Sequence, residues 1–223
     1  MANTKIESSV SNFEDEQDFP IRPLVRTVGI LDKARVASTA LALASSITVL
    51  GLTADALAVY NRTHVAPDFF LPLWPRGFDI RPTTALVATS TILLVVNLAS
   101  LAVSKTSSLR HRAAVHVSVN LAAPLLGFIV ALISMAFYYG VNTSTTSDTF
   151  QSWTCRWSSV PMQAEPHFDT LCHQSQVSTG LNVMLVPLEA IILGLAGYQL
   201  VLEKRISSMT SSRGQKATSP SLS

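Results

Sequence analysis

The chain has 223 residues, of which 48% are apolar and only 13% are charged, whereas about 25% are charged in an average soluble domain. The net charge of +2 is too small to indicate a nucleic-acid partner, and no run of Lys and Arg with interleaved aromatic residues contradicts this. The composition indicates a protein that lies in lipid.

The first 20 residues are polar, and they lack the basic and apolar regions of a cleavable signal peptide. We expect residues 1–34 to form a disordered cytosolic tail whose basic end lies at the anionic inner leaflet. The first membrane span would then serve as an uncleaved anchor.

Four nearly charge-free windows predict membrane helices, because about 20 apolar residues span the hydrocarbon core of a bilayer. Within a membrane domain of residues 35–203, the predicted spans are residues 36–60, 84–103, 114–139 and 177–202, with outer loops at 61–82 and 140–176. The turn between the second and third spans is short, so these two spans should be antiparallel neighbours. The predicted fold is an all-α membrane protein, a four-transmembrane-helix bundle.

The distribution of basic residues predicts the orientation of this bundle. Of the 16 Lys and Arg residues, 12 fall in the two tails and the short middle turn, and four fall in the other two loops. The positive-inside rule therefore predicts that both termini are cytosolic. Asn61 and Asn142, each in an Asn-x-Ser/Thr tripeptide, fall on the outer side, where they are candidate glycosylation sites.

The first span carries small and polar residues on one helical face, at spacings of seven, four, three and four: Ala37, Ala44, Thr48, Gly51 and Asp55. Such a face suits a close approach between helices. Asp55 falls near the outer boundary, where we interpret it as an interfacial or capping carboxylate. The loop that follows ends in FFLPLWPRGFDIRP, whose prolines forbid a long helix, and we expect it to lie on the membrane or cap the bundle.

Polar residues within the next two spans should point into the bundle. In the second span Ser90 and Asn97 lie one heptad apart, and in the third span one stripe comprises His116, Asn120, Ala123, Gly127, Ala131 and Ser134. Asn97 and Asn120 are at similar depths when counted from their shared turn. We predict a hydrogen bond between these two side chains.

The fourth span carries Glu189 near its middle, where an ionised carboxylate cannot face lipid. Three interpretations remain open: a structural residue that is protonated or hydrogen-bonded, part of a proton or ion pathway, or a catalytic acid. The predicted depths of Asp55 and His116 place neither obviously within reach of Glu189.

The second outer loop contains both cysteines of the chain, Cys155 and Cys172. We predict a disulfide, because this loop should face an oxidising compartment. A metal site formed by these cysteines with His167 and His173 is the alternative, but its spacing matches no standard zinc pattern, and no metal is predicted.

Residues 204–223 are Ser-rich and basic, and they are expected to be disordered. Ser208 and Ser219 are candidate phosphorylation sites that would weaken attraction to anionic lipid. The sequence contains no phosphate-binding loop, nucleophile elbow, CxxC or HExxH motif, so no cofactor is predicted and no motif indicates catalysis.

The segment LPLWPRGFDIRPT and the set Trp153, Cys155 and Cys172 give the chain a layout that resembles MARVEL-like four-span membrane proteins, in particular integral membrane proteins of filamentous fungi. The resemblance covers residues 36–203, mostly as topology. It implies a non-catalytic scaffold, membrane-organising or trafficking component of the plasma membrane or a secretory endomembrane. Membrane lipids, further copies of the chain or other membrane proteins would be its partners. The alternatives are a small transporter or channel, or a membrane enzyme on a lipophilic substrate, using Glu189.

Overall fold

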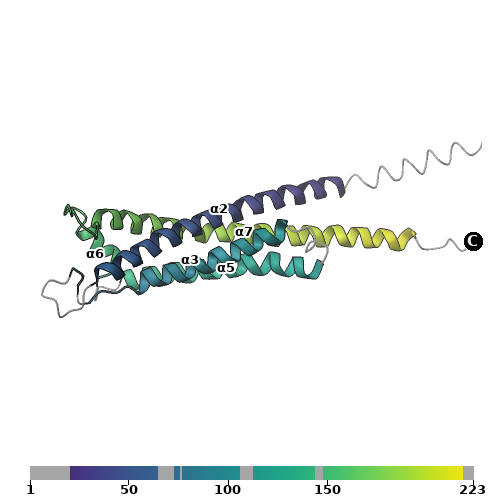
Figure 1. The fold of residues 1–223 in the computed structure, drawn as a ribbon. Coiled ribbons are helices and arrows are strands. Elements are labelled where there is room, and N and C mark those ends of the chain that lie inside the picture. The colour runs from purple at the N-terminus through teal and green to yellow at the C-terminus, as the bar shows by residue number, and fades with distance from the viewer. Residues whose placement is uncertain (1–20, 65–72, 76, 106–112, 144–147, 218–223) are drawn as a thin grey trace, which may run out of the picture. The chain divides into compact units, whose positions relative to one another are not determined.

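A computed structural model describes residues 21–64, 73–75, 77–105, 113–143 and 148–217. This part of the chain contains five helices (Figure 1): α2 (Ile21–Thr63), α3 (Arg81–Lys105), α5 (Ala113–Asn142), α6 (Phe150–Arg156) and α7 (Phe168–Ala217). Among the same residues the only β pairing is an isolated bridge between Asp79 and Thr149. The protein is therefore all-α, as predicted.

Four of these helices contain segments long and apolar enough to cross a membrane: Arg26–Thr63, Arg81–Lys105, Leu121–Val141 and Phe168–Met209. They correspond to the four predicted spans, and α3 and α5 pack against each other as the short turn between them required. The prediction of a four-transmembrane-helix bundle is confirmed.

The helices at both ends of the chain are longer than the sequence indicated. α2 begins at Ile21 and α7 continues to Ala217, so parts of both expected disordered tails are helical. The physical reason is that extending an existing helix requires no new nucleus, and Leu, Glu, Lys and Arg are good helix formers. Residues 1–20 and 218–223 lie outside the described residues.

The chain divides into two compact units. One contains residues 38–193, including parts of all four long helices and the whole of α6. The other contains the beginning of α2 and the end of α7, where Arg35 pairs with Asp32 at 3.2 Å and Gln199 donates a hydrogen bond to Glu203 at 3.1 Å. The residues discussed below belong to residues 38–193 unless stated otherwise.

Small hydroxyl residues fill much of the bundle core. Ser46, Ser90 and Ser134 are at most 2% exposed. The Ser46 hydroxyl donates to the Ala42 carbonyl at 2.8 Å and the Ser90 hydroxyl to the Leu86 carbonyl at 2.6 Å, one turn earlier in the same helix. The hydroxyl groups of Ser46 and Ser90 are satisfied within their own helices, so they can be buried while allowing helices to approach closely.

The described parts of the two outer loops form a cap over one end of the bundle. Its centre is Trp74, which is 4% exposed and whose ring lies 5.7 Å from the rings of both Phe150 and Phe168. The Trp74 indole donates to the Thr63 hydroxyl at 3.0 Å, at the end of α2. The Asp79 amide donates to the Asp148 carbonyl at 2.9 Å and joins the two loops. The described part of the first loop therefore caps the bundle, which was one of its two expected positions.

Candidate functional site

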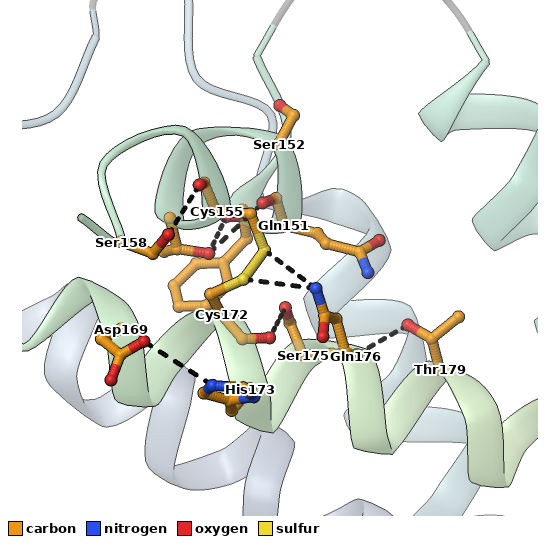
Figure 2. Close-up of a disulfide and its surroundings, with 12 residues drawn as sticks. Gln151, Ser152, Cys155, Ser158, Asp169, Cys172, His173, Ser175, Gln176 and Thr179 are labelled. Carbon is orange, nitrogen blue, oxygen red and sulfur yellow. Dashed lines mark hydrogen bonds and ion pairs between the residues drawn. A yellow bond between two sulfur atoms is a disulfide. The ribbon is translucent and has the colours of Figure 1, made fainter.

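A disulfide joins the cap to the bundle (Figure 2). Cys155 on α6 and Cys172 on α7 are bonded, with their Cα atoms 4.8 Å apart. The Gln176 amide lies over the bridge, with its nitrogen 3.8 Å and 3.5 Å from the two sulfur atoms. Both thiols are consumed, so the alternative metal site loses two of its four ligands, and the described residues contain no other cluster suited to a metal ion.

Glu189 lies at the centre of the bundle and is completely buried. The Asn97 amide nitrogen on α3 donates a hydrogen bond to Glu189 Oε1 at 2.9 Å. The other carboxyl oxygen, Oε2, is buried without a hydrogen-bond partner among the described residues. The predicted partner of Asn97 was Asn120, whose side chain lies outside the described ones, so the hydrogen bond between these two residues stays a prediction.

Gly127 on α5 provides the space that the Glu189 carboxyl group occupies. A Cβ atom at position 127 would lie 2.6 Å from Glu189 Oε2 and 2.9 Å from its Cδ atom, closer than real Cβ contacts. Only a residue without a side chain leaves this notch open. Three helices therefore contribute to one polar site: α7 supplies the carboxyl group, α3 the donor and α5 the space.

A second group of polar side chains forms a layer between the Glu189 site and the cap. The Thr89 and Ser134 hydroxyl groups are 2.9 Å apart, and the Ser134 hydroxyl donates to Asn182 Oδ1 at 3.2 Å, which links α3, α5 and α7. Tyr138, one turn further along α5, accepts a hydrogen bond from the Thr179 hydroxyl at 2.9 Å and donates to Gln151 of α6. This layer connects the three helices to the cap.

An apolar layer separates the two polar ones. Leu93, Ala131 and Leu185 are at most 1% exposed, and each lies one turn along its helix from Asn97, Gly127 or Glu189, on the side of the cap. The bundle core thus alternates between a hydroxyl and amide layer, a layer of aliphatic side chains and the carboxyl site.

A small cavity lies beside the outer polar layer. Its volume is about 20 Å³, enough for about one water molecule. Polar groups that line it include Thr53, Thr83, Tyr138, Gln151 and Ser178. The cavity is suited to solvating the hydroxyl layer, and it is too small for an organic substrate.

The remaining predicted residues are dispersed. Asp55 is exposed on α2, and its Oδ2 atom accepts a hydrogen bond from Gln174 at 3.0 Å. Asn61 is exposed in the last turn of α2. In the other unit Ser208 is exposed and donates to the Arg205 carbonyl at 2.9 Å. The side chains of His116, Asn120 and Asn142, and the whole of Ser219, lie outside the described residues.

We did not predict from the sequence that Asn182 belongs to a buried polar layer, nor that Glu189 pairs with Asn97 and Gly127. Asn182 had a visible signal, since it lies seven residues before Glu189 and therefore on the same face of α7. The pairing of Glu189 with Asn97 and Gly127 had no signal in the sequence, because it depends on which helices face α7.

These features define a multi-pass integral membrane protein, a four-helix bundle that encloses a buried carboxyl group. The chain matches no protein-family model, no curated protein and no solved structure. Its functional interpretation therefore rests on its own residues.

Proposed function

We propose that this protein organises membranes without catalysis, and that copies associate laterally through one outward face of α2. This face, called here the α2 stripe, consists of Ala40, Ala44, Ile47, Gly51, Ala54 and Ala58. All six residues are exposed in the bundle, and five of them are small. A Cβ atom added at Gly51 would have no neighbour within 4 Å. The exposed stripe is the observation that carries the proposal.

The spacing of the stripe favours a second helix as its occupant. Its members alternate at intervals of four and three residues, the repeat that gives a continuous seam between two helices with a left-handed crossing. Lipid tails gain little packing energy against such a shallow surface. A second helix can approach the surface closely and make extensive van der Waals contact. The face that the sequence singled out on the first span, with Gly51 at its centre, thus points away from the bundle.

A second copy of the chain is the simplest partner for this surface. Two identical stripes are self-complementary when they are related by a two-fold axis, the commonest symmetry of homo-oligomers. None of the six residues of the stripe is charged, and Asp55 beside it accepts a hydrogen bond from Gln174 of its own chain. Lateral association of this kind would gather copies into patches, in keeping with the implied MARVEL-like role in lipid-domain organisation or trafficking.

The orientation in our proposal has the cap outside the cell or in the lumen, with both termini cytosolic. The disulfide supports this orientation, because thiols are kept reduced in the cytosol and oxidised in the secretory pathway. An even number of crossings then returns both tails to the cytosol. Exposed Asn61 lies on the same side as the cap, as glycosylation requires. The corresponding location is the plasma membrane or a secretory endomembrane.

A small transporter or channel is the second candidate, favoured by the unpartnered Oε2 atom of Glu189. The packing of the bundle supports a transporter or channel less well than it supports a membrane-organising protein. Buried Leu93, Ala131 and Leu185 interrupt the polar side chains between Glu189 and the cap, and a conducting path would require this layer to separate.

The test measures association in vesicles that contain two populations of the full chain, labelled with donor and acceptor fluorophores on the C-terminal tail. Gly51→Leu and Ala44→Leu would put bulk into the stripe and should lower energy transfer by half or more. Ala88→Leu is the matched control, since Ala88 is an exposed alanine on α3, and it should leave the transfer unchanged. Equal transfer in all four proteins, at the level expected from random proximity, would refute the proposal.

A further inference from the structure

The two oxygen atoms of the Glu189 carboxyl group lie in unlike surroundings. Oε1 accepts the hydrogen bond from Asn97, whereas Oε2 faces the Gly127 notch and has no partner among the described residues. Glu189 is completely buried and Asn97 is 3% exposed. Oε2 is therefore the oxygen atom of this buried carboxyl group that is open to a further bonding partner.

The described side chains of the surrounding helices bring no positive charge close to this site. The other charged or titratable side chains described on the helices of this unit are Asp55, Tyr60 and Arg62 on α2, Arg81 and Lys105 on α3, Tyr138 and Tyr139 on α5, Arg156 on α6, and Asp169 and His173 on α7. Lys105 is eight residues from Asn97, about 12 Å along α3, and His173 is sixteen residues from Glu189, about 24 Å along α7. Arg62 and Arg156 form ion pairs in the cap with Glu165 and Asp148.

The space at Oε2 limits which group could bind there. A metal ion requires several oxygen ligands at about 2.0–2.6 Å. Here the carboxyl group already fills the position of a Gly127 side chain, and the described residues contain no group of three potential metal ligands. A proton needs neither additional volume nor additional ligands, since it bonds directly to one carboxylate oxygen.

We propose that Glu189 is a proton-binding site, with Asn97 and Gly127 as its positioning residues. The Glu189 carboxylate takes a proton from hydronium and releases water, which converts the buried ion into a neutral acid. Asn97 holds Oε1 as the acceptor, and the Gly127 notch holds the protonated oxygen. This goes beyond membrane organisation, because it makes the packing of α7 against α3 and α5 depend on a bound proton.

Infrared spectroscopy of the full chain in lipid vesicles at neutral pH tests the site, because neutral and ionised carboxyl groups have separate stretching bands. The difference spectrum between the native protein and Glu189→Gln should contain one C=O band of a protonated carboxyl group. Glu165→Gln is the matched control, because Glu165 is an exposed glutamate of the cap, and it should remove carboxylate intensity only. A difference spectrum for Glu189→Gln with carboxylate bands alone would overturn the proposal.

Two further measurements apply if Glu189→Gln does not fold. Carbon-13 labelling of glutamate carboxyl groups in the native chain should shift the same C=O band, and a spectrum with no labelled neutral carboxyl would overturn the proposal. Gly127→Ala should shift the band, because the new methyl group meets Oε2. Gly180→Ala adds a methyl group to open space on α7 and should leave the band in place. Identical bands in both variants would refute the role of the notch.

Discussion

The hydrogen bond between Asn97 and Glu189 can be measured by a double-mutant cycle. Asn97→Leu keeps the branching of the side chain but removes the donor, so both oxygens of a completely buried carboxyl group would lack a partner. Leaving a buried polar group unsatisfied costs about 1–3 kcal/mol. Glu189→Leu removes the group that needs the donor, so Asn97→Leu should cost less in that background.

The expected coupling free energy follows from values for hydrogen bonds between membrane helices. Hydrogen bonds between membrane helices average about 0.6 kcal/mol and reach about 1.7 kcal/mol. Because both partners here are at most 3% exposed, we expect a coupling near the upper value. The double variant should then be more stable than the sum of the single effects predicts by about 1–2 kcal/mol.

The assay is reversible unfolding of the full chain in mixed micelles, with the unfolding free energy determined for all four proteins. Ser90→Ala is a useful control, because its hydroxyl bonds within its own helix and should show no coupling to Glu189. Additive effects of Asn97→Leu and Glu189→Leu, within about 0.3 kcal/mol, would refute the reasoning that the two side chains satisfy each other.

Two further predictions concern the cap. Reduction of the disulfide, or replacement of both cysteines by serine, should lower the unfolding free energy by about 3 kcal/mol in the chain-entropy model for a sequence separation of 17 residues; equal stability of oxidised and reduced protein would contradict this. Trp74→Ala should cost about 3–5 kcal/mol, because the indole is 4% exposed at the centre of the aromatic cluster. Trp157→Ala, at a position 42% exposed, should cost much less, and similar losses in thermal unfolding for the two variants would count against a packed cap.

The membrane fold could be predicted from the sequence because lipid imposes a strong constraint on composition. Long charge-free windows gave four spans, and the heptad spacing of Ser90 and Asn97 correctly placed both on the buried face of α3. On the third span three members of the predicted stripe, Gly127, Ala131 and Ser134, are buried, and Ala123 is half-buried. Periodicity within one helix is a local property, so sequence alone reports it.

The arrangement of the site could not be predicted in the same way. Depth along the membrane suggested a pairing of Asn97 with Asn120, which stays a prediction, but depth does not specify which helix faces which. The contact between Asn97 and Glu189 joins residues 92 positions apart and depends on the rotation of α3 and α7 about their axes. Likewise, the rotation of α2 about its own axis decides that the Gly51 face points outward. Small residues suit a face toward the bundle equally well, so the sequence does not specify this rotation.

Glycosylation mapping tests whether the chain crosses the membrane four times with both termini in the cytosol. Glycosylation acceptor tags would be placed separately at the N-terminus, in the loop between α3 and α5, in the loop between α5 and α6, and at the C-terminus of the full chain expressed in a cell with a secretory pathway. We expect sugar only on the tag between α5 and α6, with the other three positions cytosolic. Sugar on either terminus, or on the loop between α3 and α5, would contradict four crossings with both ends in the cytosol.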